Sequence, residues 1–123
     1  MINSLAREVY ENAKNKGFYD ETTERNIGEM LCLIHSEVSE ALEADRKNEY
    51  ASATIETINK EKDTNLFQSH FEQGAKNSFE DELADIVIRV MDLAAYKGID
   101  LEGHVKAKIR YNKHRPYKHG KKY

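Results

Sequence analysis

Hydrophobic residues recur at intervals of three and four in four stretches of the chain, which is the spacing of one face of an α-helix. Residues that begin or end helices flank these stretches. Gly17 and Gly98 are placed as C-caps, Asp100 as an N-cap and Pro116 as a stop. We therefore predict an all-α fold, formed by one domain over residues 1–123. The four predicted helices cover residues 3–16, 23–46, 79–97 and 101–113.

Residues 47–77, between the second and third predicted helices, follow a different pattern. The segment is polar and its apolar positions are scattered: Ile55 and Ile58 predict one weak helical turn, and a short amphipathic helix is predicted to end at Gly74. A connection of this length between two packed helices is longer than most. We interpret it as an insertion, which is either a lid over a functional site or a mobile segment.

Two acidic pairs lie inside the most hydrophobic predicted helices. Glu37 and Glu40 belong to the second helix, and Glu82 and Asp85 to the third. The members of each pair are three residues apart, so they share a helix face. A helical wheel places Glu37 on the packed side of its helix and Glu82 at the border of the apolar arc. The third helix is hydrophobic on nearly all sides, so we predict that it is central and largely buried.

Carboxylates that gather at the edge of a core repel one another and lose hydration, at a cost of several kcal/mol per ion unless a cation compensates. Mg²⁺ is a suitable partner, because it prefers oxygen ligands and is commonly shared between protein carboxylates and substrate phosphates. The alternative is that these acids are solvated residues on the helix flanks, since a third of the chain is charged. Two pairs, each beside a hydrophobic stripe, favour the metal site.

The net charge of −3 conceals a basic C-terminal tail. After Glu102 there is no Asp or Glu, and this end contributes eight of the 19 Lys and Arg residues. No run reaches the roughly 18 apolar residues of a membrane span, and the N-terminus has no signal-peptide pattern, so we expect a cytoplasmic protein. The only cysteine, Cys32, lies inside an apolar helix and is predicted to be a buried small side chain.

Three residues of this tail are suited to phosphate. Lys108, Asn112 and Arg115 are four and three residues apart, so they share a face as long as the helix persists. Arg115 suits bidentate contacts with phosphate, Lys108 adds a point charge, and Asn112 donates or accepts hydrogen bonds. Acids that hold a metal, together with bases that hold phosphates, indicate a polyphosphate site. A solvated basic end, or a patch for nucleic acid, is the alternative.

Three stretches of the chain together resemble one known family. The sequences LIHSEVSEALEA (33–44) and DELADIVIRV (81–90) are similar to the Glu-x-x-Glu and Glu-x-x-Asp signature of the MazG-like all-α nucleotide pyrophosphohydrolases. The ending KxxxNxxRPYKHGK (108–121) resembles the C-terminal part of phage and bacterial members. The resemblance covers most of the chain from Ile27 onward, apart from the insertion.

The resemblance implies hydrolysis of a nucleoside triphosphate between the α and β phosphates, which gives a monophosphate and pyrophosphate. It implies Mg²⁺, with Mn²⁺ able to substitute, and a four-helix MazG-like bundle completed in a homodimer or homotetramer. In the mechanism that we expect, Glu37 or Glu40 accepts the proton of a metal-bound water, and the three tail residues steady the phosphates. The metal ligands that the family signature implies are Glu37, Glu40, Glu82 and Asp85.

The chain departs from the family pattern in the insertion. Forty-one residues separate Glu40 from Glu82, more than the usual spacing, and this leaves the recognition of the base open. Tyr50, Phe67 and Phe71 are candidates for stacking on a base, although core packing explains each of them better.

Two other functions remain open at this point. A carboxylate-bridged di-iron or di-manganese bundle uses Glu-x-x-His pairs, and no histidine here follows a Glu by three residues. His35 lies away from Glu37 and Glu40 on the wheel and is interpreted as structural. A non-catalytic helical module that binds nucleic acid or nucleotides through the tail is the second. The chain up to Glu102 has 11 Lys and Arg against 22 Asp and Glu and would repel a duplex, so nucleic acid is not the expected partner.

Overall fold

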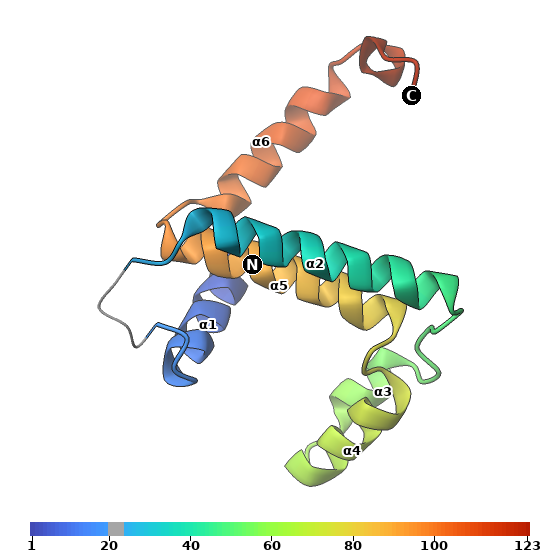
Figure 1. Cartoon of the computed structure of the whole chain (residues 1–123). Coiled ribbons are helices and arrows are strands. Elements are labelled where there is room, and N and C mark those ends of the chain that lie inside the picture. The colour runs from blue at the N-terminus through green and yellow to red at the C-terminus, as the bar shows by residue number, and fades with distance from the viewer. Residues whose placement is uncertain (20–23) are drawn as a thin grey trace. The chain divides into compact units, whose positions relative to one another are not determined.

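The computed structural model describes residues 1–19 and 24–123, and every regular element in this part of the chain is a helix (Figure 1). The predicted all-α fold is therefore confirmed. None of the helices in the described ranges has both the length and the apolar character needed to cross a membrane. The elements are α1 (Ile2–Asn15), α2 (Ile27–Arg46), α3 (Ile55–Lys60), α4 (Thr64–Gly74), α5 (Phe79–Tyr96), α6 (Leu101–Lys113) and the 3-10 helix η1 (Tyr117–Gly120).

The chain divides into two compact units. The central unit is Thr23–Val90, and the terminal unit combines Met1–Thr22 with Met91–Tyr123. The central unit contains α2, α3, α4 and the first part of α5, and the terminal unit contains α1, the end of α5, and α6 with the tail. Each unit is described by itself.

In the central unit, α2 lies beside the first part of α5 (Figure 1). Small and flexible side chains allow close packing: Met30, Ala41 and Ala44 of α2 are each about 5% exposed or less. Ser78 caps the N-terminus of α5, because its Oγ accepts a hydrogen bond from the N–H of Asp81 at 3.2 Å.

The insertion is a pair of short helices, α3 and α4, which contact each other. Ile58 of α3 is 2% exposed, and the N–H of Ser52 donates to the carbonyl of Gly74 at the end of α4, at 2.9 Å. The Asp63 carboxylate caps α4 by accepting from the N–H of Leu66 at 3.0 Å. The predicted weak turn and short helix are therefore two ordered helices, with α4 ending at Gly74 as expected.

In the terminal unit, α1 and α6 are joined through their N-terminal ends. The amide of Asn3 donates to Asp100 at 2.7 Å, and the N–H of Glu102 donates to Asn3 Oδ1 at 3.0 Å. Asp100 also caps α6, as predicted, by accepting from the N–H of Gly103 at 2.9 Å. Gly17 follows the end of α1 with φ +90°, a conformation that glycine adopts at little cost.

One boundary and several burial predictions need correction. The second helix begins at Ile27 with Asn26 as its N-cap; its predicted start, Thr23, lies outside the described residues. Cys32 is exposed, not buried. Part of the predicted apolar arc of α2 is exposed as well. The third predicted helix, α5, is not largely buried within this chain either. The exposed hydrophobic residues on these two helices are Leu31, Val38, Leu42, Leu83, Val87 and Ile88.

Candidate metal centre

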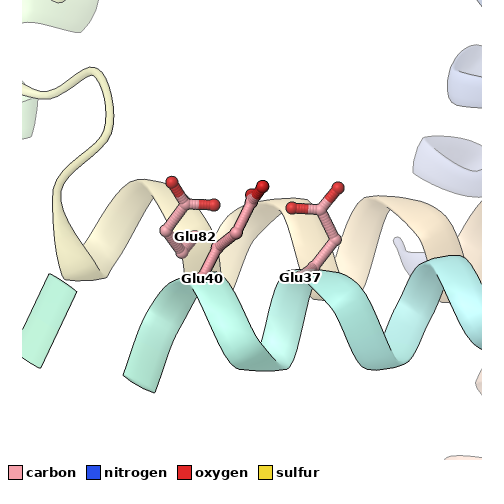
Figure 2. A group of neighbouring side chains, drawn as sticks. All are labelled: Glu37, Glu40 and Glu82. Atoms are coloured by element: carbon pink, nitrogen blue, oxygen red, sulfur yellow. The ribbon is translucent and has the colours of Figure 1, made fainter. Parts of the chain in front are cut away.

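Three carboxylates of the central unit converge on one point. Glu37 and Glu40 come from α2 and Glu82 from α5, and one oxygen of each lies within 4.8 Å of the others. Figure 2 shows the three side chains rising on the same side of the two adjacent helices. The spacing of three residues brings the α2 pair onto one face, and the packing of α5 against that face adds the third acid.

Burial differs among the three acids. Glu37 and Glu82 are each 7% exposed, whereas Glu40 is open to solvent. Glu37 is thus on the packed side of α2, as predicted. The inner side of the cluster is therefore shielded from water and its outer side is open to solvent. An ion and a ligand can enter such a site from outside.

The pKa of the Glu82 carboxyl is strongly raised. Its burial, hydrogen bonding with Glu40 and the nearby charges of Glu40, Asp85 and Glu37 raise its pKa to about 7. Its Oε2 atom is buried and has no hydrogen-bond partner among the described residues. A buried acceptor without a donor is costly, so this oxygen is well suited to a cation.

Asp85 lies one turn after Glu82 on the same helix but is not one of the three carboxylates within 4.8 Å of each other. Partial burial and the charges of Asp81 and Glu37 raise its pKa, and the charge of Arg89 lowers it. Asp85 therefore shares the electrostatic field of the cluster without its carboxylate joining the closest group.

Arg89 is a member of this site that the sequence reasoning did not single out. Its Nε donates to Glu37 Oε1 at 2.6 Å, which ties α5 to α2 and neutralises one of the buried acids. The signal was available, because Arg89 is seven residues after Glu82 and four after Asp85, and so lies on their face of the helix.

The donor set fits a hard divalent cation. Ligands on opposite sides of one Mg²⁺ are about 4 Å apart, given Mg–O distances of about 2.1 Å. Oxygens within 4.8 Å of one another reach that arrangement through small side-chain rotations. The group contains carboxylates only, with no His or Cys, which favours Mg²⁺ or Mn²⁺ over softer metals. His35 is exposed and is not part of the group.

The predicted substrate-binding residues belong to the terminal unit. Lys108 and Asn112 lie on α6, and Arg115 follows its C-cap, His114. Lys108 and Arg115 both lie against the ring of Tyr111, and Asn112 Oδ1 is buried without a hydrogen-bond partner in the described part of the chain. Their predicted role toward phosphates stays a prediction.

The raised pKa of Glu82 predicts how stability depends on pH. A carboxyl whose pKa in the folded state exceeds its ordinary value of 4.5 favours the folded state when protonated. Without metal, we therefore expect Tm to fall as pH rises from about 4.5 to about 7, since the unfolded chain releases this proton first. The carboxyls of Glu80, Asp100 and Glu102, whose pKa values are lowered, remain ionised in this range.

Thermal unfolding in EDTA across this pH range measures the effect, with Glu82→Gln as the control variant. The decline should be smaller in the variant, and Mg²⁺ should raise the Tm of the unaltered protein more at pH 8 than at pH 5. An equally steep decline in Glu82→Gln would contradict the assignment.

Comparison of the chain with known protein families, with curated proteins and with solved structures finds no match in any of the three.

Proposed function

We propose that the protein is a Mg²⁺-dependent nucleotide pyrophosphohydrolase, which converts a nucleoside triphosphate or deoxynucleoside triphosphate to the monophosphate and pyrophosphate. The observation that carries the proposal is the convergence of Glu37, Glu40 and Glu82, together with the unpartnered buried oxygen of Glu82. The likeness of residues 33–44, 81–90 and 108–121 to the MazG-like signature supports the same function.

The acids divide the work according to their burial. Glu37 and Glu82 are desolvated and suited to hold the ion, and Arg89 orients Glu37 through its hydrogen bond. Glu40 is exposed, so it can reach both the ion and an incoming water, and it is the residue to which we assign the role of base. Asp85 completes the ligand set in the proposal. Bound Mg²⁺ would neutralise phosphate oxygens and lower the pKa of a bound water.

The tail residues supply the phosphate contacts in this proposal. Lys108 and Arg115 carry the charge, and Arg115 has the planar donors that match phosphate oxygens. The unpartnered Oδ1 of Asn112 is an acceptor, so it suits a sugar hydroxyl or a base N–H better than a phosphate. We also propose that the protein is located in the cytoplasm.

A screen for pyrophosphate release tests the function. Purified protein is incubated with each ordinary and several modified nucleoside triphosphates, with Mg²⁺ and with Mn²⁺, and the products are separated by chromatography. The expected result is a nucleoside monophosphate and pyrophosphate from at least one substrate. Release of orthophosphate with a nucleoside diphosphate, or no turnover of any nucleotide, would contradict the proposal.

We also propose that a second copy of the chain covers the exposed apolar face of the central unit, in a homodimer or homotetramer. Leu31, Val38 and Leu42 are seven and four residues apart on α2, and each is 47–56% exposed. Leu83 and Val87 extend the exposed apolar surface on α5. A contiguous hydrophobic face of this kind usually marks an interface, and a surface that repeats on every copy can pair with itself.

A single substitution tests the assembly. Leu42→Lys should lower the mass measured by light scattering to that of the monomer, because a charge would be buried at the interface. Leu66→Lys is the matched control, since Leu66 is similarly exposed at 50% but lies on α4. A monomeric wild-type protein at micromolar concentration, or the same loss of mass in both variants, would contradict the interface.

A further inference from the structure

One face of α6 combines an exposed aromatic ring with two cations. Tyr111 is 61% exposed. Lys108 Nζ lies 5.1 Å from the centre of its ring, and Arg115 Cζ lies 5.8 Å from it. Lys108 lies three residues before Tyr111 on α6, and Arg115 lies four residues after it, just beyond the C-cap of the helix.

The ring of Tyr111 is open to solvent, and the two cations over it belong to long side chains that a stacking base can displace from the ring face. An open hollow beside it is lined by His104, Ala107, Lys108 and Tyr111, and none of the residues of α6 is buried. No acid follows Glu102, so no carboxylate of the tail competes for the two cations. Among the described residues, the Arg115 guanidinium makes one long hydrogen bond, at 3.5 Å, to the carbonyl of His119. Both cations therefore have capacity for an anion.

An aromatic ring beside two cations matches the base and the phosphate of a nucleotide. A planar base stacks on an exposed aromatic ring, and stacking tolerates any base because each has a π face. In a nucleotide, the sugar joins the base to the 5′-phosphate, so a base stacked on the ring leaves its phosphates within reach of the long side chains of Lys108 and Arg115. A free phosphate or a peptide carboxylate would use the cations alone and leave the hydrophobic ring uncovered.

We propose that Tyr111 is the platform on which the base of the substrate stacks, while Lys108 and Arg115 hold its phosphates. This inference rests on the proposed pyrophosphohydrolase function and adds the basis of its specificity. Stacking depends on the area of the base and not on the hydrogen-bonding groups at its edge. The site therefore accepts all bases and favours purines over pyrimidines. The aromatic residues of the insertion, Phe67 and Phe71, stack on each other and are not required for the base.

Equilibrium binding tests the platform without relying on turnover. Isothermal titration with α,β-methylene analogues of ATP and CTP, and with inorganic tripolyphosphate, is compared for the wild type, Tyr111→Leu and Tyr111→Phe. Tyr111→Leu should weaken the binding of both analogues about tenfold and leave tripolyphosphate unchanged. Tyr111→Phe, which keeps the ring, should bind as the wild type does. Tyr123→Leu is the control at a fully exposed tyrosine.

Several outcomes would overturn the platform. These are unchanged binding of the analogues by Tyr111→Leu, an equal loss for tripolyphosphate, or tighter binding of a single-stranded oligonucleotide than of the analogues. Pyrophosphate release is measured on the same samples. Binding that depends on Tyr111 without any release would overturn the hydrolysis and leave the base platform in place. Pyrophosphate release by a protein whose binding of the analogues does not depend on Tyr111 would overturn the base platform and leave the hydrolysis in place.

Discussion

Replacement of Glu40 by Gln should reduce pyrophosphate release by a factor of about 100 or more, because the variant loses a ligand charge and the proposed proton acceptor together. Glu40 is exposed, so the substitution removes no core contact. Steady-state release of pyrophosphate at saturating Mg²⁺ is the measurement. The far-UV circular dichroism signal of the helices should be the same as in the wild type.

Glu43→Gln is the matched control for this prediction. Glu43 is exposed on the same helix, three residues after Glu40, and its carboxylate pairs only with Lys47 at 3.7 Å. An exposed pair of this kind contributes little to stability. The control should retain its activity. Equal losses in the two variants would show that the general acidity of α2, and not the position of Glu40, supports the reaction.

Replacement of Arg89 by Met should lower the free energy of unfolding by about 2 kcal/mol in the absence of metal. The substitution leaves the Glu37 carboxylate, whose side chain is 9% exposed, without the one cation that pairs with it among the described residues. Breaking a fully buried pair usually costs about 3–5 kcal/mol, and the smaller value reflects the 39% exposure of the Arg89 side chain. Urea denaturation in EDTA measures the difference.

The double variant Glu37→Gln with Arg89→Met separates the loss of a charge pair from a loss of packing. Removal of both charges should recover most of the stability, because no uncompensated carboxylate remains. Mg²⁺ should also restore part of the stability of Arg89→Met by replacing the missing positive charge. A double variant that is no more stable than Arg89→Met would indicate that the arginine side chain acts through packing.

The helices and the core of the acidic site followed from local patterns in the sequence. Periodicity and caps identified every long helix, since both are properties of residues close together in the chain. The burial of Glu37 also followed, because a wheel records which residues share the packed face. Asp63, as the cap of α4, was an additional signal that would have located the start of the second helix of the insertion.

The errors in the predicted burial have one physical cause. A helical wheel shows that Val38 and Leu42 belong to an apolar face, but it does not show whether this chain or a second one covers that face. Cys32 was assigned to the interior for the same reason and is exposed. The spacing of Arg89 placed it on the helix face of Glu82 and Asp85, but its pairing with Glu37, 52 residues away, depends on how α2 and α5 are packed.

Binding of Mn²⁺ measures most directly whether the carboxylates form a metal site. Free Mn²⁺ is followed by electron paramagnetic resonance while it is titrated into the protein, with and without an α,β-methylene nucleotide. We expect saturable binding that the nucleotide strengthens and that Glu82→Gln and Glu40→Gln each weaken, while Glu43→Gln leaves it unchanged. Mn²⁺ binding that is unaffected by the loss of Glu40 and Glu82, or absent even with the nucleotide, would contradict the proposed metal centre.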